Sequence, residues 1–269
     1  MNFLNKLFSF FKNEKKIKLG LALGSGGAKG FAELGAIRAF EENGIEFDVI
    51  AGTSIGSVVG AFYANGYSST DILELIKRMN FLEILSAPFI GMDTSGMRSV
   101  IDNQIGGLEF EDLKKNFKAV ATEMDTGNEK VFDSGSVADA LCASSCMVPF
   151  FKPVVIDGKR YIDGAFVNSV PADIVKGMGA DYIVGIDLKD HEAKPSVITR
   201  FFPTYKGKVE KPWENGYKYS NIVLHPDLSG YKAESINGSG VMYERGYECA
   251  MQNMDRIKSD IEKLKKGEK

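Results

Sequence analysis

Residues 17–66, IKLGLALGSGGAKGFAELGAIRAFEENGIEFDVIAGTSIGSVVGAFYANG, repeat one pattern twice: an apolar run, a loop of small residues and a helical segment. The first unit joins an apolar run at 17–23 to residues 31–43, whose apolar positions have helical spacing. The second joins a short run at 47–51 to another helix through Gly-Thr-Ser-Ile-Gly at 52–56. Two consecutive strand–helix units predict an α/β fold in which a parallel sheet is joined by right-handed helical crossovers.

The rest of the chain predicts further strands and helices and one irregular region. Apolar runs and turn signals indicate strands at 117–122, 130–132, 154–156, 161–162, 182–186 and 222–224, and helices at 71–80, 137–146 and from 241 onward. Residues 190–220 contain three prolines and an aromatic cluster among Lys and Arg, which predicts a loop insertion. No internal repeat or long linker is present, so we expect a single domain at 17–269 after an amphipathic segment at 1–16.

Composition excludes several classes of function. The 269 residues are 44% hydrophobic, as in ordinary globular proteins, and 33 Lys and Arg against 36 Asp and Glu provide no basic field for nucleic acid. Three cysteines without C-x-x-C spacing, Cys142, Cys146 and Cys249, indicate reduced thiols in a cytoplasmic setting rather than a disulfide framework. Closely spaced acidic ligands of the calcium type are absent from the sequence, so we expect no metal and no cofactor.

Two segments bear on contact with membranes. The apolar residues near the N-terminus share one helical face beside several lysines: Phe3, Leu4, Leu7, Phe8 and Phe11. Their order differs from that of a signal peptide, and the segment is either a helix packed on its own domain or a helix in a membrane interface. The longest uncharged run, 49–70, is interrupted by glycine, serine and asparagine, which predicts a buried strand, turn and helix rather than a membrane span.

The glycine-rich loop at 24–30 lies between a strand and a helix, where backbone amides form an anion site. A dinucleotide-binding fingerprint requires glycine at the position of Lys29. A phosphate-binding P-loop requires Ser or Thr directly after that lysine, where this chain has Gly30. The loop therefore matches neither nucleotide-binding motif. The remaining interpretation is an oxyanion hole formed by the amides of Gly26 and Gly27, with Ala28 as a third candidate donor.

The motif Gly52-x-Ser54-x-Gly56 lies between a strand and a helix, the context of an exposed nucleophilic serine. A base must take the serine proton, and the chain has only two histidines, His191 and His225. Either histidine would indicate an esterase of the α/β-hydrolase type. The alternative base is Asp163, which ends a predicted strand and precedes Gly164; it must lie in a partly desolvated pocket against the hydroxyl.

Together these motifs resemble the patatin-like phospholipase family, specifically its short bacterial members. The resemblance runs from about residue 18 to 187 and includes the stretches 140–149 and 168–171. The supporting motif positions are Gly24, Gly30, Gly52, Gly56, Gly164 and Ala165. The family implies a three-layer α/β/α fold with a central, mostly parallel sheet. It further implies a Ser54–Asp163 dyad, an oxyanion hole at Gly26 and Gly27, and an acyl-serine intermediate.

The resemblance implies a lipid acyl hydrolase of the phospholipase A, lysophospholipase or esterase type, acting on phospholipid or another acyl ester. The cysteine pattern predicts a cytoplasmic protein, and residues 3–18 and 198–220 are the candidates for peripheral contact with the inner face of the membrane. The loop 198–220 is otherwise a satellite hydrophobic cluster over the core or a dimer contact. Besides the histidine-dependent esterase, one alternative remains open: a non-catalytic regulatory lipid-binding module on the same fold.

Overall fold

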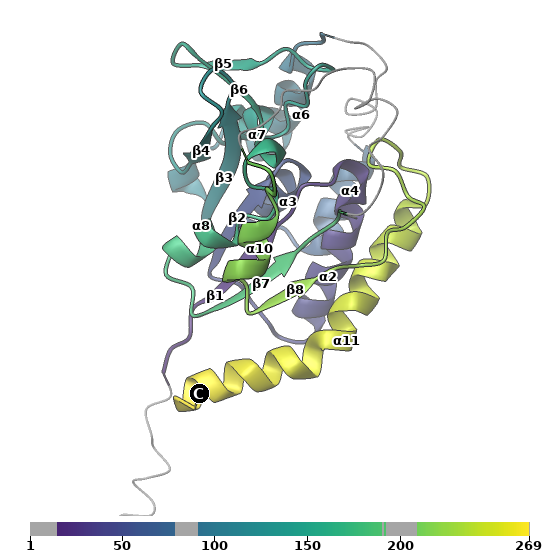
Figure 1. Ribbon diagram of the computed structural model, residues 1–269. Helices are drawn as coiled ribbons and strands as arrows, with labels where there is room; N and C mark the ends of the chain where they lie inside the picture. The colour runs from purple at the N-terminus through teal and green to yellow at the C-terminus, as the bar shows by residue number, and fades with distance from the viewer. Residues whose placement is uncertain (1–14, 79–90, 190, 192–208, 269) are drawn as a thin grey trace, which may run out of the picture.

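The computed structural model describes residues 15–78, 91–189, 191 and 209–268. The described part contains an eight-stranded sheet with helices on both faces (Figure 1). The strands are β1 (Leu19–Leu23), β2 (Val49–Thr53), β3 (Asn116–Glu123), β4 (Asn128–Phe132), β5 (Val154–Ile156), β6 (Lys159–Asp163), β7 (Tyr182–Ile186) and β8 (Ile222–Leu224). The order is β5-β6-β3-β2-β1-β7-β8, and β4 pairs with β3.

The centre of the sheet is parallel, as the two strand–helix units predict. β3, β2, β1, β7 and β8 run in the same direction, and the predicted hairpin of β3 and β4 is antiparallel. β6 also pairs antiparallel with β3, which the sequence did not indicate. The expected mostly parallel sheet is therefore confirmed, with an antiparallel extension at one side.

Alternate residues of β1 face two separate layers. Leu21 and Leu23 belong to the larger apolar cluster, which includes residues of α2 (Phe31–Glu42), α3 (Ile55–Ala64) and α11 (Ser239–Lys266). Ala22 belongs to a second cluster with α8 (Ala172–Gly177), against which Tyr219 of α10 (Glu214–Tyr219) packs. Because side chains of a strand point alternately to opposite faces, the sheet is enclosed between two helical layers. The three-layer arrangement is confirmed.

Three further α-helices of the described residues contribute side chains to the larger cluster. They are α4 (Ser69–Arg78), α6 (Ser95–Ile105) and α7 (Val137–Ser144). The expected loop insertion at 190–220 is wrong for residues 214–219, which form α10 and pack against α8 with Gly216 close to the side chain of Val170. Residues 192–208 of that insertion lie outside the described residues, as does the N-terminal segment up to residue 14.

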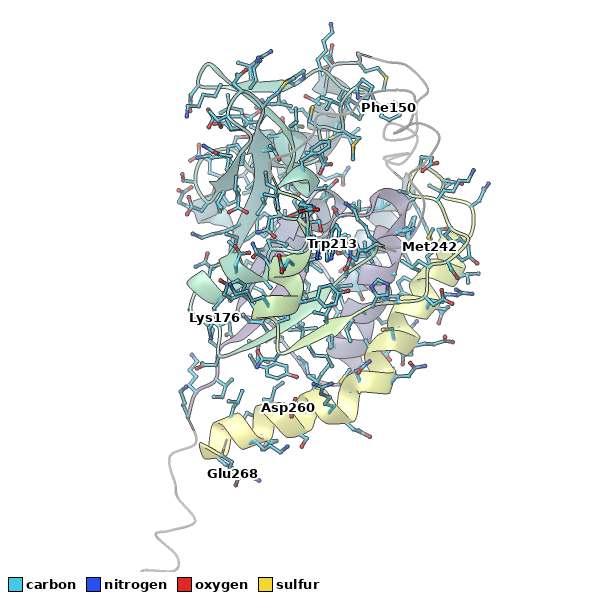
Figure 2. The ribbon with its side chains drawn as sticks, viewed as in Figure 1. Phe150, Lys176, Trp213, Met242, Asp260 and Glu268 are labelled. Atoms are coloured by element: carbon cyan, nitrogen blue, oxygen red, sulfur yellow. The ribbon has the colours of Figure 1, made fainter. Side chains whose placement is uncertain are left out.

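The uncharged run at 49–70 forms β2, α3 and the start of α4, so the predicted strand, turn and helix are confirmed. Within the described ranges, none of the helices is both long and apolar enough to span a membrane. The longest helix, α11, follows one side of the domain, with Met242 and Glu268 near its opposite ends (Figure 2).

Candidate active site

The ends of β2 and β6 meet beside β3. β2 pairs with β3 up to Thr53 opposite Val120, and β6 pairs with β3 in the opposite direction down to Asp163 opposite Ala121. β4 pairs with residues 119–123 of β3 along its other side. β2 and β6 therefore lie along the same side of β3, and their C-terminal ends point toward each other. This topology brings Ser54, which follows β2, next to Asp163, although they are far apart in the sequence.

Ser54 occupies a strained turn between β2 and α3. Its φ of 56° and ψ of −125° are rare for a residue with a side chain and cost on the order of 1–3 kcal/mol. The turn requires glycine nearby, because a Cβ on Gly56 would lie 2.5 Å from the carbonyl oxygen of Leu23. This close approach places the start of α3 against the end of β1 and directs Ser54 toward the edge of the sheet at which β1 and β2 end.

The side chains of Ser54 and Asp163 are hydrogen-bonded. The Ser54 hydroxyl donates to Asp163 Oδ2 over 2.7 Å. Ser54 is 9% exposed and Asp163 is 1% exposed, so the carboxylate is shielded from water while the serine keeps limited access. The predicted neighbours are therefore in direct contact, in the desolvated setting that a carboxylate base requires.

Burial raises the pKa of Asp163 above its ordinary value. Three groups oppose this effect by favouring the charged form: the Ala165 amide, the Ser54 hydroxyl and the positive charge of Lys189. The Ala165 N–H donates to Asp163 Oδ1 over 2.8 Å, which leaves Oδ2 directed to the serine. The carboxylate is thus oriented by one fixed bond and made more basic by its surroundings.

The glycine-rich loop follows β1 and lies against the start of α3, where a Cβ on Gly56 would lie 2.6 Å from the carbonyl oxygen of Gly24. Within the described residues, no turn or loop hydrogen bond engages the amides of Gly26 and Gly27. The Ala28 N–H donates to the carbonyl oxygen of Ala233 over 2.7 Å. An amide in such a bond cannot also donate to a substrate oxygen, so Ala28, expected as a third donor, is not free for that purpose in this structure.

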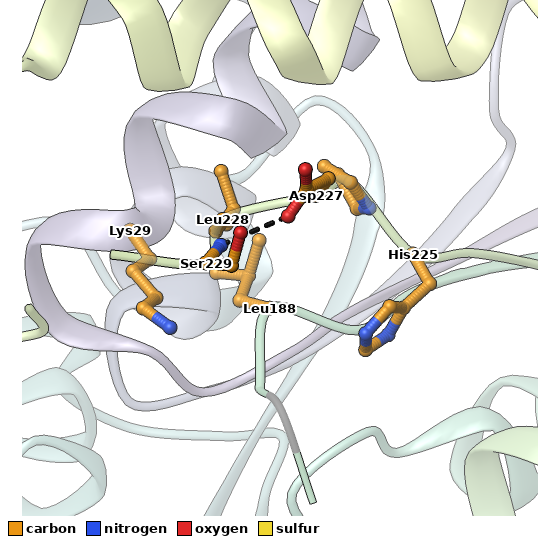
Figure 3. Close-up of a pocket in the computed structure, with 7 residues that line it drawn as sticks. Lys29, Leu188, His225, Asp227, Leu228 and Ser229 are labelled. Atoms are coloured by element: carbon orange, nitrogen blue, oxygen red, sulfur yellow. Dashed lines mark hydrogen bonds between the residues drawn. The ribbon is translucent and has the colours of Figure 1, made fainter. Parts of the chain in front are cut away.

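A cavity of about 220 Å³ lies beside the loop, lined by Lys29, Leu188 and residues 225–229. Lys29 and His225 lie on opposite sides of it (Figure 3). Neither Ser54 nor Asp163 lines this cavity. The cavity therefore adjoins the glycine loop and does not open onto the Ser54 side chain.

Comparison with known proteins decides the family. The model of the patatin-like phospholipase family matches residues 21–176, which is more than half of the chain. The chain belongs to the patatin-like phospholipase family. Its relatives include patatin-like phospholipase domain-containing protein 7 of Mus musculus, 27% identical over 90% of this chain. Lysophospholipase nte1 of Aspergillus fumigatus is 31% identical, also over 90% of this chain. This chain spans 18% of the length of each of these two relatives.

The fold of this patatin-like chain is also found in a solved structure. VipD from Legionella pneumophila superposes with a TM-score of 0.61 and 14% sequence identity, covering 90% of this chain and 67% of VipD. At this identity the likeness concerns the fold alone. It agrees with the three-layer arrangement and the mostly parallel sheet described above.

Both histidines of this patatin-like chain contact one aspartate other than Asp163. His191 Nε2 lies 2.6 Å from Asp187 Oδ2, and His225 Nδ1 lies 4.0 Å from the same oxygen. The His191 ring stacks at 4.0 Å on that of Trp213. Trp213 lies at the start of α10 (Figure 2). The hydroxyl of Ser54, by contrast, donates to Asp163. The arrangement places the histidines in a separate cluster and does not favour the histidine-dependent alternative.

The described residues include no group of three or more His, Cys, Asp or Glu side chains placed to hold a metal ion. Cys142 and Cys146 are both buried as free thiols, and burial raises the pKa of each thiol to about 12. Both cysteines therefore stay protonated at neutral pH and behave as small apolar side chains.

Three buried hydroxyls around the pair were missed by the sequence reasoning. Thr53 donates to the carbonyl oxygen of Asn168 over 2.8 Å, and Thr122 donates to the carbonyl oxygen of Asp163 over 2.8 Å. Ser144 contacts the backbone of Ser54. Ser144 lies within the family-like stretch 140–149, which was the one available signal, whereas Thr122 is an ordinary β-branched strand residue in sequence.

Proposed function

We propose that this protein is a serine-dependent lipid acyl hydrolase, a carboxylic ester hydrolase in which Ser54 is the nucleophile and Asp163 the general base. The observation that carries the proposal is the 2.7 Å hydrogen bond between the two side chains. Membership of the patatin-like phospholipase family and the lysophospholipase among its relatives support a lipid ester as substrate.

The proposed reaction uses these groups as follows. Ser54 Oγ forms a bond to the ester carbonyl carbon while its proton passes to Asp163 Oδ2. The amides of Gly26 and Gly27 donate to the oxygen that becomes negative, and loss of one such donor costs on the order of 3 kcal/mol. The intermediate collapses to an acyl-serine, and the leaving alcohol takes the proton from Asp163. Water then attacks the acyl-serine by the same route and restores Ser54.

Peripheral contact with a lipid surface is part of the proposal, and the two candidate segments differ in position. Residues 15–18 precede the start of β1, whereas the glycine loop follows its other end. The carbonyl of Pro212, in the second segment, accepts a hydrogen bond from Ser169, whose carbonyl accepts one from Ser25 of the glycine loop. Pro212 is thus linked through Ser169 to the glycine loop, and this link favours the segment 198–220 as the membrane contact that delivers substrate.

The test of the proposed nucleophile is covalent labelling. Incubation with a fluorophosphonate probe, followed by mass spectrometry of the digested protein, is expected to locate the adduct on Ser54. Ser54→Ala is expected to abolish both the label and the hydrolysis of a short-chain ester. An adduct elsewhere, or undiminished esterase activity of Ser54→Ala, contradicts the proposal. A wild-type protein that binds lipid vesicles but turns over no ester indicates the non-catalytic module instead.

The histidine-dependent alternative predicts a different result. Because both histidines contact Asp187, we expect His191→Gln and His225→Gln each to retain kcat/KM within about threefold, as for side chains that do not transfer the proton. Initial rates on the same short-chain ester provide the measurement. A loss of 100-fold or more in one variant that keeps the wild-type unfolding temperature contradicts the Ser54–Asp163 assignment, since removing a general base costs about 100-fold or more.

A further inference from the structure

Ser144 connects the backbone of Ser54 to β3. It is the last residue of α7 and is fully buried. The Ser54 N–H donates to Ser144 Oγ over 2.9 Å, and the Ser144 hydroxyl donates to the carbonyl oxygen of Val120 over 2.6 Å. A hydroxyl has one proton to donate. Because that proton is directed to Val120, a lone pair of Ser144 is left for the Ser54 amide, and the orientation of the hydroxyl is determined.

The Ser54 amide needs such a partner. Ser54 immediately precedes α3, so no earlier turn of that helix supplies a carbonyl for its N–H. A buried N–H without an acceptor is energetically unfavourable, and this cost would add to the strain of the positive φ. The hydrogen bond to Ser144 removes this cost and thereby stabilises the backbone conformation that directs the Ser54 side chain toward Asp163.

Asp163 is held by the same strand. The Thr122 hydroxyl donates to the carbonyl oxygen of Asp163, two residues along β3 from Val120. A Cβ on Gly164 would lie 2.2 Å from the oxygen of Val120, the oxygen that also accepts the Ser144 hydroxyl. Val120 and Thr122 of β3 thus contact both sides of the pair, through a backbone carbonyl and a side-chain hydroxyl, and Ser144 is the link on the serine side.

We propose that Ser144 is a positioning residue for the nucleophile: by holding the Ser54 amide against Val120, it fixes the serine in the orientation that attacks the ester. This inference rests on the proposed function. Ser144 is not assigned any contact with the substrate or with Ser54 Oγ. Its effect is therefore on the rate of acylation rather than on substrate binding.

The adjacent residue provides a matched control. Ser145 is also buried, and within the described residues its hydroxyl has no hydrogen-bond partner. We expect Ser144→Ala to lower kcat and the rate of fluorophosphonate labelling by about 10- to 100-fold, because a displacement of about 1 Å can cost about 100-fold. KM is expected to stay within about twofold, since ground-state binding is unchanged. Ser145→Ala is expected to behave as wild type in all three measurements.

Hydrogen exchange separates this inference from the proposed function. The Ser54 amide, followed by NMR, is expected to exchange at least about tenfold faster in Ser144→Ala than in Ser145→Ala, since the loss of about 1.4 kcal/mol of protection corresponds to tenfold. If wild-type protein does not react at Ser54, the proposed function fails and the exchange rate still decides whether Ser144 holds the amide. If wild type reacts and the two variants match it or lose activity equally, the positioning role is overturned.

A milder variant covers the case in which Ser144→Ala does not fold. Ser144→Cys keeps a side chain of similar shape, but a thiol is a weak donor and acceptor. It is expected to lower the labelling rate by about 3- to 30-fold, as for a weakened hydrogen bond, at unchanged KM. Labelling and exchange rates equal to those of wild type in Ser144→Cys also overturn the proposal.

Discussion

Asp163→Asn is expected to lower kcat/KM for an ester substrate by about 1000-fold, because an amide cannot accept the proton of Ser54 and general-base catalysis contributes about 100- to 10,000-fold. The fold is expected to tolerate the change. An asparagine oxygen can still accept the bond from the Ala165 amide, and the side chain is similar in shape. Steady-state kinetics with a short-chain ester, together with thermal unfolding of both proteins, provides the measurement.

The stability of this variant has a defined dependence on pH. Burial raises the pKa of Asp163 in the folded state, so wild-type stability falls as pH rises from the ordinary carboxyl range through the folded pKa. Asparagine does not ionise and lacks this loss. The unfolding free energy of Asp163→Asn, taken relative to that of wild type, is therefore expected to increase between pH 4 and pH 8. A shift in the opposite direction contradicts the assigned cause of the raised pKa.

In the proposed mechanism, the same carboxyl determines the acid limb of the pH–rate profile. Asp163 must be charged to accept the serine proton, so kcat/KM falls as pH is lowered through its pKa. Because burial raises that pKa, we expect the limb to lie above the range of an exposed aspartate, near 4. The limb should be unchanged in His191→Gln and His225→Gln. An acid limb near 6.5 that disappears in either variant would identify a histidine as the base instead.

The two residues of the proposed dyad were predictable because each occupies a local sequence pattern, but the place where they meet was not. Gly52 to Gly56 between a strand and a helix indicates the turn at Ser54, and Asp163 follows a run with strand character. The sequence contains no local sign that β6 pairs antiparallel with β3, at the edge that β2 also uses. That pairing joins residues about forty positions apart, and together with the pairing of β2 and β3 it explains why the two strand ends converge.

The unpredicted parts of the site depend on long-range contacts of the same kind. The amide of Ala28 is engaged by a carbonyl more than two hundred residues later in the chain, at Ala233, and no property of the loop sequence reveals it. Ser144 occurs in a run of small residues in which a hydroxyl has no distinctive spacing. Its role depends on where α7 ends relative to Ser54 and Val120, which is a property of packing rather than of pattern.

The contact between α2 and α11 could not be predicted from the sequence pattern either. Disrupting it is expected to cause the largest loss of stability. The two helices approach so closely that backbone touches backbone. A Cβ on Gly246 of α11 would lie 1.8 Å from the carbonyl oxygen of Ala32, and a Cβ on Gly35 of α2 would lie 1.9 Å from that of Tyr243. Backbone atoms on both sides cannot rotate away as a flexible side chain can. An added methyl group must therefore separate the helices.

Gly246→Ala is accordingly expected to lower the free energy of unfolding by about 3 kcal/mol, at the upper end of the usual cost of overpacking. For a chain of this size that corresponds to roughly 6–12 °C in Tm, as measured by calorimetry or circular dichroism. Gly240→Ala is the control on the same helix, since no atom lies within 4 Å of the added Cβ. Replacing glycine in a helix gains up to about 1 kcal/mol, so this variant should unfold at or above the wild-type temperature. Equal Tm values for the two variants would contradict the close approach of α2 and α11. A loss confined to Gly246→Ala would show that α11 is held on the domain by direct contact between the backbones of the two helices.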